Sequence, residues 1–178
     1  MADGTKTRAE WVAATLARYE QPLMRYTARF CPDGESARDV VQDAFLRLCA
    51  ADRSAVEGHE AGWLYTVCRN RALDVRRKEG RMDPLPEAKV ARIRSDSPGP
   101  GDQAAHRQEH RRALEVIGSL PDDQQEAFRL KFQDQLTYRE ISQVMEVSLG
   151  TVSALLTRGL AEVRRQLVSG DLAQEVGR

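Results

Sequence analysis

Hydrophobic residues recur at helical spacing in two separate stretches of the chain. In the first stretch, apolar side chains separated by gaps of three and four residues form one stripe: Val12, Leu16, Tyr19, Leu23, Tyr26 and Phe30. This spacing predicts a helix with one buried face. Pro22 lies inside the stripe, where it either kinks the helix or begins a new one.

Two more helices are predicted after a turn at residues 31–34. The second helix directs its small and apolar side chains inward: Ala37, Val41, Ala44, Phe45 and Leu48. A polar stretch, residues 52–60, separates it from a third helix. The third helix has a short apolar stripe, made of Leu64, Val67, Cys68 and Val75. Its many arginines are expected to stay in solvent.

The second stretch has the pattern of a helix-turn-helix. Pro121 begins a helix with acidic residues in its first turn, where negative charge suits the helix dipole. Its apolar surface comes from Ala127, Phe128, Leu130 and Phe132. Residues 137–140 form a capping box that opens a short helix. The inward positions of this helix and of a second one from about residue 150 are Ile141, Val144, Met145, Val152, either Leu155 or Leu156, Leu160, Val163 and Leu167.

Between the two stretches, Pro, Gly, Ser and Asp accumulate without a sustained apolar period. Such a composition neither propagates a helix nor pairs well in a sheet. The sequence therefore predicts an all-α protein of two small helical domains joined by a flexible linker. The predicted limits are residues 1–80, the linker 81–105, the helix-turn-helix domain 106–168 and a C-terminal tail 169–178.

Composition limits the chemistry of these 178 residues. The 27 basic and 27 acidic side chains cancel, and no apolar run approaches the roughly 20 residues of a membrane span. The polar N-terminus leads us to expect a cytoplasmic protein without membrane insertion. No phosphate loop or nucleophile elbow is present, the three cysteines fit no zinc pattern, and His106 with His110 lacks further ligands. We therefore expect no catalysis, cofactor, metal or small-molecule substrate.

Three blocks of sequence resemble bacterial sigma factors of the two-domain, extracytoplasmic-function (ECF) type. They are residues 39–48, residues 63–77, and the span 120–152 with its Leu-Pro, Leu-Thr-Tyr-Arg-Glu-Ile and Gly-Thr-Val motifs. The resemblance runs from about residue 19 to residue 167 with a linker in the expected place. It implies a subunit that docks on core RNA polymerase, recognises the upstream promoter element with its helix-turn-helix and opens the downstream element with its N-terminal domain.

The resemblance also assigns candidate binding residues in the first domain. On the second helix, Asp39, Gln42, Asp43 and Arg47 would bind the clamp helices of the largest polymerase subunit. The other interpretation of these side chains is an ordinary solvated helix face. Residues 33–43 hold four acids and one base, and this excess of negative charge would complement a basic docking surface.

The third helix is the candidate for promoter melting. Residues 69–81 carry six bases against two acids, which indicates attraction to phosphates. The candidate contacts with the downstream element are Arg69, Asn70, Arg71, Arg76, Arg77 and Lys78. By resemblance, the 52–60 loop receives an extruded base. Trp63 and Tyr65 are candidate stacking residues, with core packing as the other interpretation of Trp63, and Asn70 with Asp74 can be a structural pair.

The helix-turn-helix departs from the family pattern. Glu146 stands in the turn where members usually have glycine, and the recognition helix has few basic residues. The candidate contacts with the upstream element are Thr137, Arg139, Ser148, Thr151, Ser153, Thr157 and Arg158. This composition predicts weak DNA binding that uses hydroxyl groups more than bidentate arginines.

Two other classes of function stay open from the sequence. One is a sigma-like regulatory protein that binds polymerase or an antagonist without directing initiation, which the sparse recognition helix favours. The other is a one-component repressor, although the sequence contains no visible dimerisation or ligand site. Under the sigma-factor hypothesis the partners are core RNA polymerase and promoter DNA, with an anti-sigma factor as a further candidate.

Overall fold

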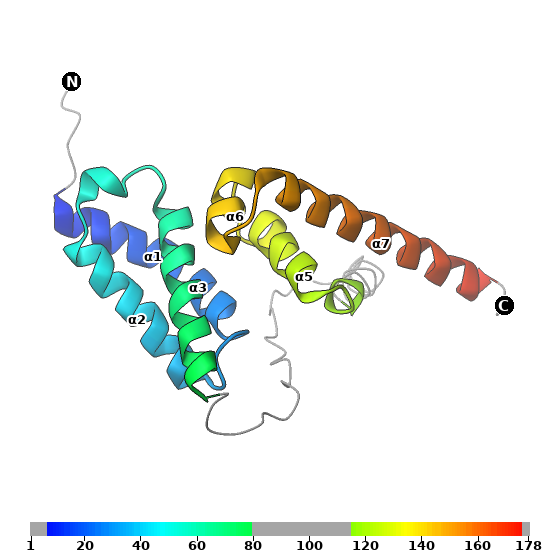
Figure 1. Cartoon of the computed structure of the whole chain (residues 1–178), viewed down its shortest axis with the longest axis horizontal. Coiled ribbons are helices and arrows are strands. Elements are labelled where there is room, and N and C mark those ends of the chain that lie inside the picture. Colours follow the sequence, from blue (N-terminus) through cyan, green and yellow to red (C-terminus); the bar gives the residue numbers. More distant parts are fainter. Residues whose placement is uncertain (1–6, 80–114, 176–178) are drawn as a thin grey trace, which may run out of the picture. The chain divides into compact units, whose positions relative to one another are not determined.

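The computed structural model describes residues 7–79 and 115–175 of the chain. All regular structure within these ranges is helical, which confirms the predicted all-α class. The chain divides into two compact units, residues 1–94 and residues 95–178 (Figure 1). The predicted linker, residues 81–105, lies outside the described residues, as do His106 and His110.

The described part of the first unit consists of α1 (Arg8–Thr27), α2 (Gly34–Ala50), the short helix η1 (Arg53–Ala55) and α3 (Glu60–Glu79). Each of the three long helices packs against the other two. As predicted, Ala37, Val41, Ala44, Phe45 and Leu48 of α2 are buried. Leu64 and Cys68 of α3 are also buried, whereas Val67 and Val75 are only half-buried.

The buried face of α1 differs from the predicted stripe. Trp11 is 5% exposed, whereas Leu16, a member of the predicted stripe, is 39% exposed. Thr15 and Thr27 share the buried face because each hydroxyl donates a hydrogen bond, at 2.8 Å, to a carbonyl oxygen one turn earlier. Pro22 lies within the continuous helix, so it does not begin a new one.

The second unit contains α5 (Asp122–Phe128), the π-helical turn η2 (Arg129–Gln133), α6 (Tyr138–Met145) and α7 (Leu149–Glu175). Helix α7 packs against both α5 and α6. The predicted inward residues Ile141, Val144, Met145, Val152 and Val163 are buried, and Leu156 rather than Leu155 takes the disputed position. The predicted tail is helical as far as residue 175.

Two predicted core residues of this unit are exposed. The π-helical turn shifts the helical phase, so Phe132 is 60% exposed while Leu136 is 1% exposed. On α7, Gly159 faces the core in place of the predicted Leu160. The backbone of Gly159 lies close to the ring of Phe128, and Leu160 is 39% exposed.

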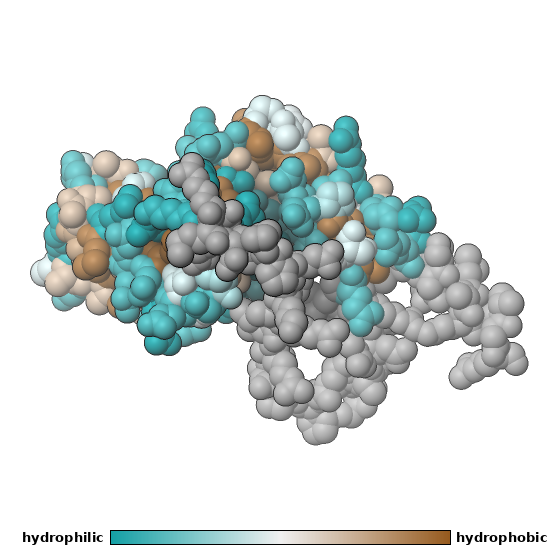
Figure 2. Space-filling view, turned by 60° about the horizontal axis from the view of Figure 1, so that its bottom comes forward, coloured by the Kyte–Doolittle hydropathy of each residue, from teal (hydrophilic) through white to brown (hydrophobic). Residues whose placement is uncertain are grey.

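Hydrophobic residues reach the face of the molecule drawn in Figure 2 as separate patches between hydrophilic ones. Within the described ranges, no helix combines the length and the apolar character needed to cross a bilayer.

Candidate functional site

The predicted polymerase-binding residues lie together on the outer face of α2. This helix begins after Asp33, whose carboxylate accepts a hydrogen bond from the backbone N–H of Ser36 at 2.7 Å. Asp39 and Gln42 are exposed. Asp43 is half-buried and forms an ion pair with Arg47, with Nε 3.0 Å from Oδ2. The structure thus leaves Asp39, Gln42 and Arg47 exposed, and Asp43 partly covered.

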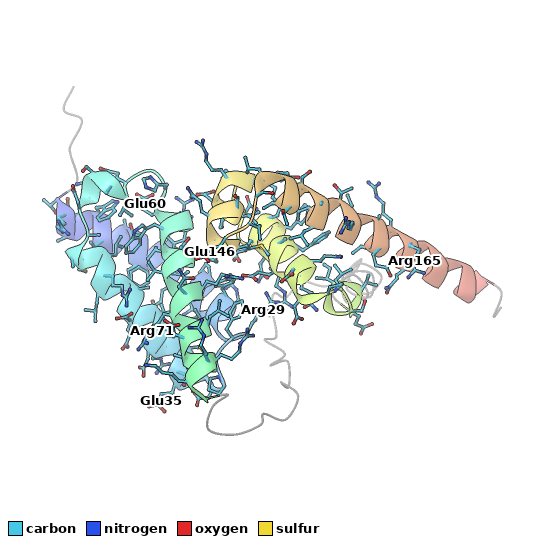
Figure 3. All side chains as sticks on the ribbon, in the orientation of Figure 1. Arg29, Glu35, Glu60, Arg71, Glu146 and Arg165 are labelled. Atoms are coloured by element: carbon cyan, nitrogen blue, oxygen red, sulfur yellow. The ribbon has the colours of Figure 1, made fainter. Side chains whose placement is uncertain are left out.

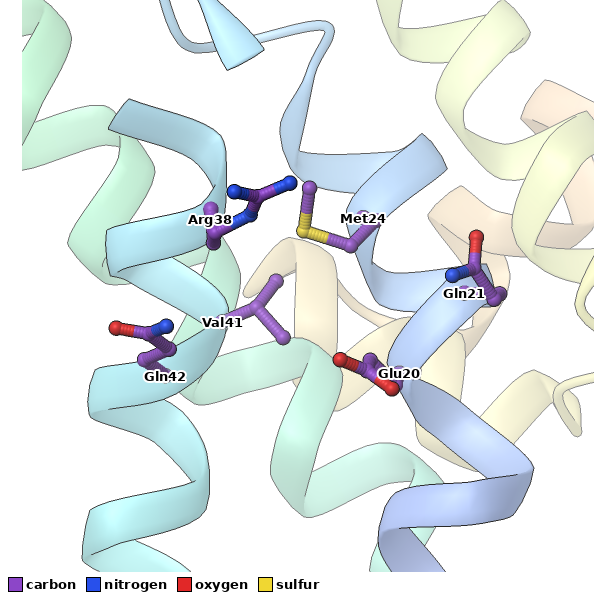
Figure 4. Close-up of a pocket in the computed structure, with 6 residues that line it drawn as sticks. All are labelled: Glu20, Gln21, Met24, Arg38, Val41 and Gln42. Carbon is purple, nitrogen blue, oxygen red and sulfur yellow. The ribbon is translucent and has the colours of Figure 1, made fainter. Parts of the chain in front are cut away.

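A depression of about 440 Å³ lies between α1 and α2 beside this face. Met24 and Val41 contribute apolar surface to it, with polar groups around them (Figure 4). The complete lining is Glu20, Gln21, Met24, Arg38, Val41 and Gln42. Because Gln42 belongs to both, the depression is continuous with the predicted polymerase-binding face.

Asp43 connects the two candidate sites of the first unit. Its Oδ2 atom lies 3.9 Å from the Nε atom of Arg71 on α3, in addition to its contact with Arg47. Burial, followed by the nearby negative charges of Asp43 and Cys31, raises the pKa of the Cys68 thiol to about 12. Cys68 is therefore a neutral core residue near Asp43. Among the described residues, no group of His, Cys, Asp and Glu side chains is arranged to hold a metal ion.

The basic end of α3 is largely accessible to solvent. Arg76, Arg77 and Lys78 are exposed on its last described turns, and Asn70 is exposed one turn before Asp74. Asp74 forms an ion pair with Arg77 at 3.1 Å. Of the remaining candidate residues, Arg69 and Arg71 are half-buried. Figure 3 places Arg71 on α3, well along the helix from Glu60 at its beginning.

The two aromatic candidates on α3 have different environments. Tyr65 is 1% exposed, and its ring centroid lies 5.0 Å from that of Tyr26 on α1. It is a core residue, so the idea that it stacks on a base is wrong. Trp63 is half-buried in the first turn of α3 and stays a candidate for either role.

The loop that precedes α3 is a compact turn. Asp52 caps η1 by accepting hydrogen bonds from the backbone N–H and the hydroxyl of Ser54, at 3.0 and 2.9 Å. Val56 is 1% exposed and fixes the middle of the loop in the core. Gly58 has a φ of +88°, a conformation that side chains rarely adopt. Ser54, Ala55 and residues 57–59 remain exposed.

In the second unit, several predicted DNA contacts use their hydroxyls in helix caps. Thr137 accepts from the N–H of Glu140 at 3.2 Å and completes the predicted capping box. Ser148 accepts from the N–H of Thr151 at 3.0 Å, and their hydroxyl oxygens are 2.8 Å apart. These three residues are exposed, as are the other four candidates: Arg139, Ser153, Thr157 and Arg158.

Glu146 occupies the turn between α6 and α7 in the left-handed conformation, with φ 57° and ψ 41° (Figure 3). A non-glycine residue there costs about 1–2 kcal/mol. Glu146→Gly removes this strain and is expected to stabilise the second unit. The gain should be only about 0.5–1 kcal/mol, because the greater entropy of glycine in the unfolded chain offsets part of the strain removed. Thermal unfolding followed by circular dichroism measures this gain.

The matched control is Gln143→Gly, three residues earlier and exposed on α6. This substitution should destabilise the unit by about 1 kcal/mol, the ordinary cost of glycine inside a helix. Equal losses in both variants would show that the turn gains nothing from glycine.

Comparisons with known proteins cover both units. The family model for Sigma-70 region 2 matches residues 15–82, and that for Sigma-70, region 4 matches residues 110–163. The ECF RNA polymerase sigma factor SigE of Mycolicibacterium smegmatis is 31% identical over 157 residues, which cover 85% of this chain and 60% of SigE. The chain belongs to the sigma-70 family, as a member of the ECF type.

Other sigma factors are similar to most of this chain. SigW of Bacillus subtilis is 26% identical over 159 residues, which cover 84% of each protein. The sigma factor RpoE from Bartonella quintana, solved with the anti-sigma factor NepR, superposes with a TM-score of 0.62 at 21% identity, covering 87% of this chain and 95% of RpoE. The structural similarity to RpoE supports the helical fold of this chain.

Proposed function

We propose that this chain is a sigma factor that directs core RNA polymerase to specific promoters and promotes DNA opening for transcription initiation. The observation that carries the proposal is the match to sigma-70 region 2 followed by region 4, each lying on its own helical unit. In this role the chain is a non-catalytic subunit that works in the cytoplasm. Its partners are the polymerase and promoter DNA, with an anti-sigma protein as a third.

Each unit has a distinct task in this proposal. Asp39, Gln42, Asp43 and Arg47 of α2 contact the clamp helices. The basic side chains of α3 hold the downstream element, and the exposed residues of α6 and α7 contact the upstream element. Few of the exposed residues of α6 and α7 are cationic. Ser153 and Thr157 therefore contact bases, while Arg158 supplies positive charge for the phosphates.

Run-off transcription with purified core polymerase on a genomic promoter library tests the function. The sigma-factor hypothesis requires defined transcripts that depend on the added chain. Polymerase binding without any transcript would instead favour the regulatory protein that does not direct initiation. That alternative has some support in the hydroxyls of Thr137, Ser148 and Thr151, which the helix caps already use.

Reversing the charge of Asp39 is expected to weaken core binding at least tenfold, about 1.4 kcal/mol. Asp39→Lys places a cation where a basic docking surface would approach. Because Asp39 is exposed, the stability of the chain should change by no more than about 0.5 kcal/mol. Binding to labelled core polymerase and thermal unfolding give the two values.

The control for this experiment is Ala13→Lys, which adds a cation at an exposed position of α1 outside the predicted interface. It should leave core binding unchanged. A similar loss of affinity in both variants would point to overall charge, and a large drop in melting temperature for Asp39→Lys would make Asp39 a structural residue.

A further inference from the structure

The first turn of α1 contacts the loop before α3 at several points. The guanidinium of Arg8 donates to the carbonyl oxygens of Cys49 at 2.5 Å and Ala51 at 2.6 Å. Cys49 lies in the last turn of α2, where helix carbonyls lack partners within the helix, and Ala51 is the residue that follows the helix. Arg8 therefore fixes the point at which the chain leaves α2 and enters the loop.

Trp11 holds the other end of the same loop. Its indole N–H donates to Oε1 of Glu60, the first residue of α3, at 3.0 Å. Partial burial alone would raise the pKa of Glu60, yet the hydrogen bond from Trp11, together with backbone N–H groups and the charge of His59, lowers it below the ordinary value. Glu60 thus carries its charge near neutral pH and stays a strong acceptor.

The middle of the loop is attached to the same tryptophan. The guanidinium of Arg53 lies over the Trp11 ring, 5.6 Å from its centroid. Arg53 also pairs with Glu57 through two contacts, at 3.0 and 2.5 Å. Trp11 is 5% exposed, so its ring is a rigid support beneath a loop whose own buried anchor is Val56.

From these contacts we propose that Arg8 and Trp11 are positioning residues that hold the 52–59 loop in the shape required to accept an extruded promoter base. This inference rests on the proposed function. A loop that is ordered before the base arrives avoids the entropic cost of ordering during binding, and this raises its affinity for the base. The region 2 family model begins at residue 15, so both residues lie outside the segment that it matches.

The test uses holoenzyme reconstituted from the full chain and core polymerase. The probe is a single-stranded non-template oligonucleotide from the downstream element of a promoter found by the run-off library. A second probe carries an abasic site at the base that most affects binding. The ratio of the two affinities measures base capture, whereas backbone contacts and overall folding affect both probes alike.

Trp11→Phe keeps a buried aromatic ring but removes the N–H donor to Glu60. We expect it to lower the ratio of matched to abasic affinity about three- to tenfold. Arg8→Gln, at an exposed position, should lower the ratio in the same direction if the tryptophan variant folds poorly.

The matched control is Thr15→Val, which removes one buried hydrogen bond from the same helix without touching the loop. It should reduce the melting temperature and leave the affinity ratio unchanged. An unchanged ratio in both Trp11→Phe and Arg8→Gln overturns the proposal and leaves Trp11 as a stabilising residue only. If the wild-type holoenzyme itself does not distinguish the two probes, base capture and this proposal both fail, and run-off transcription then tells whether promoter direction survives.

Discussion

Replacing Gly159 with alanine is expected to destabilise the second unit by about 1–2 kcal/mol, although alanine usually stabilises a helix. A Cβ atom on Gly159 would lie 2.4 Å from one ring carbon of Phe128 and 3.1 Å from another. Phe128 is 5% exposed, so its stiff ring has little room to move. Overpacking costs about 1–3 kcal/mol and exceeds the gain of up to about 1 kcal/mol in helix propensity.

Thermal unfolding gives this effect as a shift of roughly 4–8 °C per kcal/mol for a unit of this size. Both tryptophans of the chain, Trp11 and Trp63, belong to the first unit. Tryptophan fluorescence therefore reports on that unit, while circular dichroism reports on both. Gly159→Ala should lower the transition seen by circular dichroism and leave the fluorescence transition in place.

Gly150→Ala is the matched control on the same helix. The nearest atom to its added Cβ is the Ser148 hydroxyl oxygen at 3.7 Å, an ordinary contact, so the stability should stay equal or rise slightly. Combining Gly159→Ala with Phe128→Leu should cost less than the sum of the two single changes, because the smaller side chain makes room for the methyl group. A neutral Gly159→Ala would mean that the Phe128 ring swings aside without loss.

Local chemistry made much of this fold predictable. The capping box at Thr137 and Glu140 depends on a few adjacent residues, and the structure confirms it. The buried face of α2 was equally clear, since small and apolar residues there alternate sharply with charged ones. These features need no knowledge of distant parts of the chain.

The errors arose where tertiary contacts override the pattern. Periodicity selected Leu16 for the core of α1 and gave no reason to place Trp11 against the loop before α3, 49 residues away. The π-helical turn that exposes Phe132 has no signal in an analysis based on a period of 3.6. Trp11 and Glu60 become neighbours only when the chain folds, because 49 residues separate them in the sequence.

The candidate binding residues show the same limit. The family resemblance placed Asp43 with the polymerase and Arg71 with DNA, yet their side chains lie 3.9 Å apart across α2 and α3. Sequence separation hides such pairs because the register between two helices depends on the whole core. The contact also determines how a substitution at Arg71 should be interpreted, because Asp43 retains Arg47 at 3.0 Å when Arg71 is removed.

Replacing Arg71 and Arg76 together with alanine is expected to depress transcription from a duplex promoter by about ten- to a hundredfold. The two cations belong to the basic part of α3 that is proposed to hold the downstream element, well along the helix from the 52–59 loop. Extrusion of a base costs a few kcal/mol that the protein must supply. Each tenfold loss corresponds to about 1.4 kcal/mol of lost stabilisation. Core binding should stay within about twofold because the residues proposed to face the clamp helices are on α2.

A template already mismatched across the downstream element distinguishes melting from anchoring. It removes the unpairing cost, so the double variant should recover part of its activity there, whereas Arg18→Ala, at an exposed cation of α1, should behave like the wild type on both templates. Equal loss on duplex and mismatched templates would contradict a melting role and indicate plain phosphate anchoring. Loss of core binding would instead place Arg71, through its contact with Asp43, at the polymerase interface.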